Sequence, residues 1–341
     1  MKKRIIVGLL IMLTLMSSAF ATSVTSAPAA TVNLIRNKVI TTQDLNDAIA
    51  TYTGTGLSNL EVLQILINDE VFLQGAERAG VTLSSSQLDS LYAQQKSSIE
   101  QQVGASLTNE QYDQLITQQY GSVANAKEFL KNQYILNTYV MQEKGDELNS
   151  RSYAPTDAEV RNYYKKNQTT FVMSEYVKFS QIIKYKSDDA SANEAALNTL
   201  NKVSSDIKSG KITFEAAVNQ YTDDEESKAV GGEAGWLMSS NTTAREGFGD
   251  EFVDTVLGQG VGVVSEVLES NIGYHIVKVS VHQDAKLLGI NDRINPEEST
   301  TVYQYIQAGL AQQNMQLALS AAVDEILADL TKEARIRILY K

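Results

Sequence analysis

The residues that could do chemistry in this chain are few. Only two histidines are present, His275 and His282, and cysteine is absent. A disulfide framework, a thiolate zinc site and a cysteine nucleophile are therefore excluded, and a metal site built from several histidines lacks its ligands. A serine hydrolase would have to use one of the two histidines, but no nucleophile-elbow sequence accompanies either of them. Any chemistry that needs an imidazole must therefore involve His275 or His282.

Three further patterns have both a functional and a structural interpretation. Phe248 and Phe252 stand four residues apart, so on a helix they would share one face and form an apolar slot; ordinary core packing is the alternative. The acidic run 223–226 could hold a hard cation, but charge runs are more often solvated surfaces. The stretch 258–262 has the glycine spacing G-x-G-x-G with no βαβ unit after it, which favours a turn over a nucleotide-binding loop.

Composition narrows the function further. A chain of 341 residues that is 43% hydrophobic and 21% charged can bury a core, and its length is typical of about two domains. It carries 41 acidic against 29 basic residues, a formal net charge of −12. A phosphate-binding surface needs clustered lysine and arginine, so nucleic acid is not an expected partner.

The first 21 residues differ from those that follow. Basic residues at 2–4 precede an apolar run at 5–16, and small residues end the segment at Ala19 and Ala21. This pattern predicts a Sec-type signal peptide that is cleaved after Ala21, with an uncleaved anchor as the alternative. No cysteine follows the run, so a lipoprotein is excluded. We expect a periplasmic or otherwise extracytoplasmic protein without stable membrane insertion after cleavage.

Three prolines mark the organisation of the remaining chain. Pro28, Pro155 and Pro296 separate segments of different hydrophobic period. The segment before Pro155 is predicted to be helical, with helix starts of the capping-box type at Ser58 and Glu61, Ser84 and Gln87, and Thr108 and Gln111. Its apolar stripe at 60–73 is wider than one helix face, which indicates burial on several sides.

After Pro155 the hydrophobic period changes, and the new pattern predicts a small α+β domain whose last strand pair is antiparallel. Strands are predicted at 175–185, 263–268 and 274–279, and helices at 188–209, 214–221 and 248–257. The tail is predicted to be helical from Pro296, near the first helical position, to Leu330. A last strand at 335–341 needs a partner, which 31–40 offers, so the two ends of the chain would meet in one domain with the α+β unit inserted between them.

Between Phe179 and Val279 the chain contains, in order, the motifs FSQII, FEAAVNQYTDDEES, GGEAGW, FGDEF and VVSEVLESNIGYHIVKV. This series resembles the parvulin family of peptidyl-prolyl isomerases. Each motif is weak alone, but the combination of GGEAGW with GYHIVKV is specific. The segment 67–84, with the sequence INDEVFLQGAERAGVTLS, is similar to the N-terminal chaperone segment of the SurA and PrsA foldases.

This resemblance implies an α+β fold in which a discontinuous, mostly helical chaperone domain carries one inserted parvulin-like domain, an antiparallel sheet flanked by helices. The expected division follows from it: signal peptide 1–21, chaperone domain 22–155 and 297–341, linker helix 156–171, parvulin-like domain 172–282 and linker 283–296.

The resemblance also implies site residues. The catalytic positions correspond to Gln181, Asp224, Ser270 and His275, and the prolyl-binding positions to Phe248 and Phe252. The family has a histidine in the first strand where this chain has Gln181. An amide can donate and accept hydrogen bonds in place of that imidazole, but it cannot titrate.

The function implied is that of an exported foldase that binds unfolded or nascent outer-membrane or secreted polypeptides and isomerises X–Pro bonds without a cofactor. Activity is expected to be weak because of Gln181. The alternative is a non-catalytic holdase whose parvulin domain only binds peptides, and a structural periplasmic adaptor would need neither site.

Overall fold

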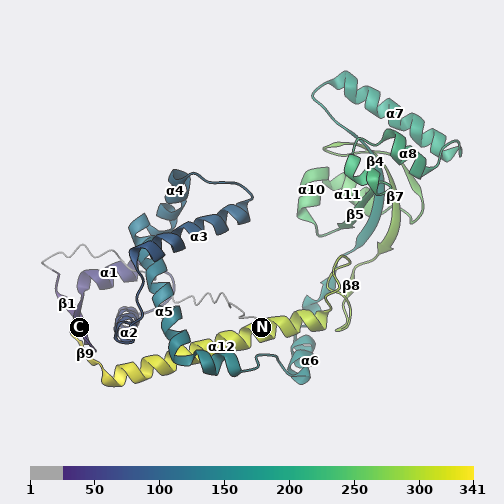
Figure 1. Ribbon diagram of the computed structural model, residues 1–341. Coiled ribbons are helices and arrows are strands. Elements are labelled where there is room, and N and C mark those ends of the chain that lie inside the picture. Colours follow the sequence, from purple (N-terminus) through teal and green to yellow (C-terminus); the bar gives the residue numbers. More distant parts are fainter. Residues whose placement is uncertain (1–25) are drawn as a thin grey trace. The chain divides into compact units, whose positions relative to one another are not determined.

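The computed structural model describes residues 26–341, which form two compact units (Figure 1). Unit 1 contains the described residues up to Tyr153 together with Gln312–Lys341, and unit 2 is Ala154–Ala311. The signal peptide predicted at 1–21 lies outside the described residues. The predicted α+β class is confirmed: long helices accompany three small antiparallel sheets. Within residues 26–341, no helix has the length and apolarity needed to cross a bilayer.

Unit 1 is built from helices around a three-stranded sheet. Its strands are β1 (Pro28–Asn33), β2 (Asn37–Thr41) and β9 (Arg335–Ile338), in the order β2-β1-β9. Its helices are α1 (Thr42–Thr51), α2 (Asn59–Arg78), α3 (Ser85–Val103), α4 (Asn109–Tyr120), α5 (Val123–Ser150) and the later part of α12 (Val302–Glu333). The final strand is antiparallel to β1, with Thr31 opposite Arg337. The strand predicted at the end of the chain therefore has its partner in the first described strand.

Local side-chain chemistry fixes where the helices of unit 1 begin. The three capping boxes predicted for α2, α3 and α4 are all present, and Thr41 with Asp44 forms a fourth at the start of α1. In each of them the cap side chain accepts the N3 backbone N–H, and the N3 side chain accepts the N–H of the cap residue. These bonds depend on residues three positions apart, which is why the sequence locates these helix starts well.

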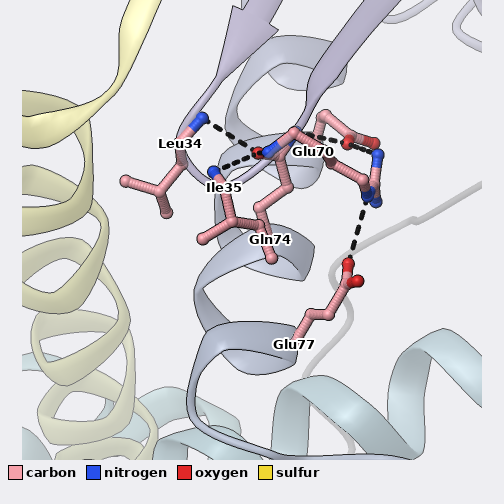
Figure 2. Close-up of polar contacts among 6 residues, drawn as sticks. Leu34, Ile35, Glu70, Gln74 and Glu77 are labelled. Carbon is pink, nitrogen blue, oxygen red and sulfur yellow. Dashed lines mark hydrogen bonds and ion pairs between the residues drawn. The ribbon is translucent and has the colours of Figure 1, made fainter.

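The stretch 31–40, expected as one strand, is instead a hairpin. Its turn is held by the buried side chain of Gln74 on α2 (Figure 2): Oε1 accepts N–H groups from Leu34 at 2.9 Å, Ile35 at 3.0 Å and Arg36 at 3.3 Å. One amide oxygen therefore satisfies three backbone donors that a continuous strand would have paired with a neighbour.

The core of unit 1 forms where α12 meets α2 and α5. Helix α2 is buried on several sides, as its wide stripe predicts, through residues that include Leu63, Ile67 and Val71. The part of α12 in this unit adds five buried side chains: Leu319, Ala322, Val323, Ile326 and Leu330. A Cβ on Gly75 would lie 2.5 Å from Leu330 Cδ1, so this glycine permits the close approach of the two helices.

Unit 2 centres on a four-stranded antiparallel sheet. The strands β4 (Tyr176–Tyr185), β5 (Glu233–Met238), β6 (Val264–Glu269) and β7 (Gly273–Gln283) lie in the order β5-β4-β7-β6. The helices are α7 (Ala190–Lys208), α8 (Phe214–Tyr221), α9 (Glu225–Ala229), α10 (Thr242–Phe248) and α11 (Asp250–Leu257). One apolar cluster joins α11 to one face of the sheet, and a second joins α7 and α8 to the other.

A third cluster in unit 2 includes the ranges expected as linkers. It joins α6 (Asp157–Lys166), the short strand pair β3 (Val172–Met173) and β8 (Lys286–Leu287), and the first turns of α12. Val160 and Leu288, from the expected linkers 156–171 and 283–296, are both buried there. The compact units accordingly divide at 153 and 311, whereas the expected boundaries are 155 and 297.

The start predicted for the tail helix is wrong. Helix α12 begins at Val302, and Pro296 lies in the loop before it. The Asn295 side chain accepts the N–H groups of Glu297 at 2.9 Å and Glu298 at 2.7 Å, which is a turn that competes with helix formation. The helix starts only after Thr301, whose hydroxyl accepts the backbone N–H of Gln304 at 3.2 Å.

Candidate functional site

The two central strands of unit 2 bring Gln181 and His275 to the same face of the sheet. In the antiparallel pair of β4 and β7, Gln181 lies opposite Val277 and Ile183 lies opposite His275. Alternate residues of a strand point to the same side, so Gln181, Ile183, His275 and Val277 share one face. This is the face that α11 covers, because Val277 belongs to the apolar cluster with Val253 of α11.

A buried chain of hydrogen bonds joins three of the site residues predicted from the sequence. The Nδ1 of His275 lies 2.8 Å from Gln181 Oε1, and its Nε2 lies 2.7 Å from Ser270 Oγ. A carbonyl oxygen can only accept, so Nδ1 carries the proton and donates to Gln181. Nε2 then accepts from the Ser270 hydroxyl. The imidazole is fully buried, and Gln181 and Ser270 are each 5% exposed.

The turn between β6 and β7 fixes the Ser270 hydroxyl. Its oxygen accepts the backbone N–H of Ile272 at 3.1 Å and that of Gly273 at 3.2 Å. With both acceptor sites used, the single hydroxyl proton is directed to His275 Nε2. The turn thus sets the orientation of the imidazole from one side while Gln181 sets it from the other.

Phe248 and Phe252 lie beside this imidazole. The Phe252 ring centroid is 4.5 Å from that of His275, and Phe248 stacks on Phe252 at 5.3 Å. Phe252 is 2% exposed and belongs to the core cluster, whereas Phe248 is half-buried. Phe248 therefore forms the accessible part of this aromatic pair, and Phe252 also has the core-packing role that the sequence left open.

Asp224, the fourth residue that the resemblance assigns to catalysis, has a capping role in the structure. It is the N-cap of α9, and its carboxylate accepts the N–H groups of Glu226 at 3.2 Å and Ser227 at 3.4 Å. Its negative charge also helps to raise the pKa of Tyr185, after the larger effect of burial. The hydrogen-bonded chain contains Gln181, His275 and Ser270, and Asp224 lies outside it.

Gly232 of the GGEAGW motif supports the backbone on which Gln181 sits. Its carbonyl accepts the Gln181 N–H at 2.8 Å, and its φ is +81°. A Cβ here would lie 2.7 Å from the Gln181 carbonyl oxygen and 2.8 Å from Val218 Cγ2. Only glycine satisfies both the backbone angle and this close approach, which gives the motif a physical reason.

Sequence reasoning missed Lys186, which neighbours the site from the end of β4. Its Nζ donates to the Ser270 carbonyl oxygen at 2.7 Å and pairs with Glu269 Oε1 at 2.7 Å. No motif of the sequence singles it out, because its partners come from the end of β6 and the turn that follows. Burial, and to a lesser degree the charge of Lys186, lower the pKa of His275 to about 3. The imidazole is therefore neutral throughout the physiological pH range.

The depressed pKa of His275 predicts a pH-dependent loss of stability in unit 2. The unfolded chain binds a proton at this histidine below about pH 6.5, and the folded unit does not until about pH 3. The stabilisation is complete above pH 6.5 and declines as the pH falls. Between pH 7 and pH 4.5 we expect the free energy of unfolding to drop by roughly 3 kcal/mol through this group.

Denaturant titration of unit 2 at several pH values measures this effect. A His275→Gln variant that still folds should lack the drop, and the exposed His282→Gln should retain it. An equal drop in wild type and His275→Gln would contradict the assignment of the effect to this imidazole.

A grouping of possible metal ligands lies elsewhere in unit 2. Ligand atoms of Glu175, His282 and Asp284 lie within 4.8 Å of one another, and His282 and Asp284 are exposed. A 2.9 Å hydrogen bond between His282 Nε2 and Glu175 Oε1 already joins two of these residues.

The chain matches one domain family and resembles several known proteins. Residues 182–281 match the PPIC-type PPIase (rotamase) domain, a range that contains Phe248, Phe252, Ser270 and His275 and begins one residue after Gln181. The chain is 30% identical over 87 residues to the chaperone SurA of Photorhabdus laumondii, which is 26% of this chain and 19% of that protein. It is 27% identical over 186 residues to the foldase PrsA 3 of Bacillus cereus, 54% of this chain and 53% of that protein.

The chain thus spans about a fifth to about half the length of these curated relatives. Among solved structures, a SurA-like chaperone of Campylobacter jejuni is 14% identical, with a TM-score of 0.39 over 92% of this chain and 99% of that one. PrsA of Bacillus anthracis is 18% identical, with a TM-score of 0.28 over 80% and 96%. Together, the domain match and the curated relatives confirm the parvulin resemblance: residues 182–281 form a PPIC-type, parvulin-like domain, and the chain that carries it is similar to SurA and PrsA proteins over part of their length.

Proposed function

We propose that this protein is an exported foldase that binds unfolded polypeptides through unit 1 and catalyses cis–trans isomerisation of X–Pro bonds in unit 2. The observation that carries the proposal is the buried chain Gln181–His275–Ser270 beneath the stacked pair Phe248 and Phe252. These residues occupy the positions that the parvulin motifs assign to catalysis and proline binding.

Isomerisation makes demands that such a site can meet without a nucleophile or cofactor. The barrier to rotation about a peptide bond is about 18–20 kcal/mol, and it falls when the twisted amide is bound more tightly than the planar one. In the proposed mechanism the prolyl ring packs against Phe248 and Phe252. The neutral imidazole of His275, oriented by Gln181 and Ser270, provides a fixed dipole beside the rotating bond. Asp224 would contribute negative charge at the edge of the site.

The alternative is a holdase whose parvulin unit binds peptides without isomerising them. Gln181 favours it, because an amide replaces the family's histidine, and so does the burial of Phe252, which leaves only Phe248 open to a prolyl ring. The two candidates differ in one measurable quantity, the rate of X–Pro isomerisation.

A proline-tetrapeptide assay of the mature protein separates the two functions. We expect measurable catalysis by the wild type and a several-fold increase in Gln181→His, because a second imidazole would restore the family's hydrogen-bonded pair. Gln220→His, an exposed change of the same kind on α8, should leave the rate unchanged. No catalysis by the wild type and none by Gln181→His would decide for the holdase.

Export and clients complete the proposal. The basic, apolar and small-residue pattern at 1–21 supports export to the periplasm or another extracytoplasmic compartment by a cleaved signal peptide. Similarity to SurA chaperones and a PrsA foldase supports unfolded polypeptides as partners, and we propose outer-membrane or secreted proteins as the clients.

A further inference from the structure

Unit 1 contains a pocket of about 550 Å³ that lies between α2, α5 and the β1–β2 hairpin. Its walls combine charged side chains with six apolar ones: Ile40, Leu66, Leu73, Val81, Leu83 and Ile135. A pocket of this size can hold one long side chain with part of its backbone. The mixed lining fits a ligand that is itself apolar along its length and charged at its end.

Most charged groups around the pocket already have partners. Arg36 is bound by Glu70 at 2.6 Å and by Glu77 at 3.1 Å, and Figure 2 shows this group at the hairpin turn held by Gln74. Glu70 also accepts from the Gln74 amide at 2.7 Å. This wall of the pocket is therefore a closed network whose cation is not available to other carboxylates.

Four other charged residues of the lining lie outside this network: Asp44, Lys38, Glu128 and Lys131. Asp44 accepts the backbone N–H of Thr41 at 2.8 Å as part of the α1 capping box. Lys38 has an interaction partner of its own. Glu128 and Lys131, three residues apart on α5, balance each other in charge.

Asp69 differs from the other charged residues of the lining because desolvation is the only effect acting on its carboxyl. It lines the pocket, and among residues 26–341 no hydrogen-bond donor or cation is paired with its carboxylate. Burial alone raises its pKa to about 8, and no cation opposes that effect. Asp69 is half-buried, and a desolvated carboxyl without a partner costs stability, so its presence at the wall of a pocket indicates a site for a ligand rather than a role in folding.

We propose that this pocket receives a lysine or arginine side chain of an unfolded client, with the methylene stem against the apolar wall and the cation at Asp69. The lining carries five carboxylates and three cations, and the whole chain has a net charge of −12, so both the site and the molecule attract basic segments. The inference rests on the proposed chaperone function of unit 1 and names the client chemistry that it selects.

Calorimetry with two matched peptides tests the proposal. The probes are a short, capped, leucine-flanked peptide with lysine at its centre and the same peptide with norleucine, which keeps the stem and lacks the charge. At pH 7 the full-length protein should bind the lysine peptide at least tenfold more tightly. Binding should release close to one proton, because the cation lowers the pKa of Asp69 below the ambient pH. The heat should therefore vary with the ionisation enthalpy of the buffer.

Two variants and one separate assay complete the experiment. Asp69→Asn should reduce the preference for lysine to less than twofold and abolish proton release, while Asp146→Asn, an exposed change on α5, should alter neither. Equal binding of both peptides by the wild type, no binding of the lysine peptide, or an unchanged preference in Asp69→Asn would overturn the inference. Suppression of client aggregation by the wild type reports on the chaperone function itself, so its loss would instead count against the proposed function.

Discussion

A chain that ends at Ala311 is expected to lose the structure of unit 1 while unit 2 stays folded. The deletion removes β9, which pairs with β1, and five buried side chains of α12, including Leu319, Ile326 and Leu330. Burial of one large aliphatic side chain contributes about 1.5–3 kcal/mol. Three such residues alone approach the net stability of a domain, about 5–15 kcal/mol, so the remainder of unit 1 should not stay folded.

Amide hydrogen exchange distinguishes the two units in this truncated chain. We expect amides of α2 and α5 to exchange rapidly and those of β4 and β7 to remain protected. Under the proposed function, the truncated chain should also lose suppression of aggregation and retain isomerisation. A shorter deletion that begins after Ala334 is the matched control, because it removes β9 and leaves the buried residues of α12 in place. Persistent protection in α2 after the longer deletion would show that residues 312–341 are dispensable for unit 1.

Replacement of Phe252 by alanine should have the largest effect of any single substitution in the site. The ring is 2% exposed, contacts His275 and belongs to the core beneath α11, so its loss should cost about 3–5 kcal/mol of stability. Isomerisation should fall tenfold or more, which corresponds to about 1.4 kcal/mol of transition-state binding. Phe248→Ala should lower the rate by a similar factor at a smaller cost in stability, because Phe248 is only half-buried.

The control for this prediction is Phe214→Ala. Phe214 is 4% exposed in the apolar cluster on the opposite face of the same sheet. Its removal should destabilise unit 2 comparably and leave the rate per folded molecule unchanged. Thermal melts give the folded fraction, and the tetrapeptide assay gives the rate. If Phe214→Ala and Phe252→Ala reduced the rate per folded molecule equally, the aromatic pair would have no specific role in catalysis.

The sequence predicted features that depend on near neighbours. The capping box at Ser58 involves a residue three positions away, and the strand periods around Gln181 and His275 show in the alternation of their own segments. Features that depend on distant partners were missed. Gln74 lies on a helix about forty residues further along the chain, and its side chain holds the turn that divides the expected strand 31–40 into two. Nothing within the strand itself predicts that contact.

The same limit applies within the candidate site. Motif order singles out Phe252, Ser270 and His275, and in the structure the His275 ring contacts both of the other two side chains. Motif order also singles out Asp224, whose carboxylate caps α9, and this capping role was not predicted. Asp69 was not predicted from the sequence. The sequence of a helix does not show whether an aspartate in it will meet a hydrogen-bond donor or a cation in the folded protein.

The pairing of β1 with β9 also determines when unit 1 can be completed. Thr31 and Arg337 are opposite each other in the sheet, so a chain that emerges from its amino end carries the first strand long before its partner exists. Unit 2 is continuous from 154 to 311 and has all of its residues available earlier. Throughout that interval the apolar side chains of α2, including Leu63, Ile67 and Val71, have no α12 to cover them. Until β9 has been synthesised, this chain is therefore itself an incompletely folded polypeptide with exposed apolar side chains, as are the unfolded clients proposed for it.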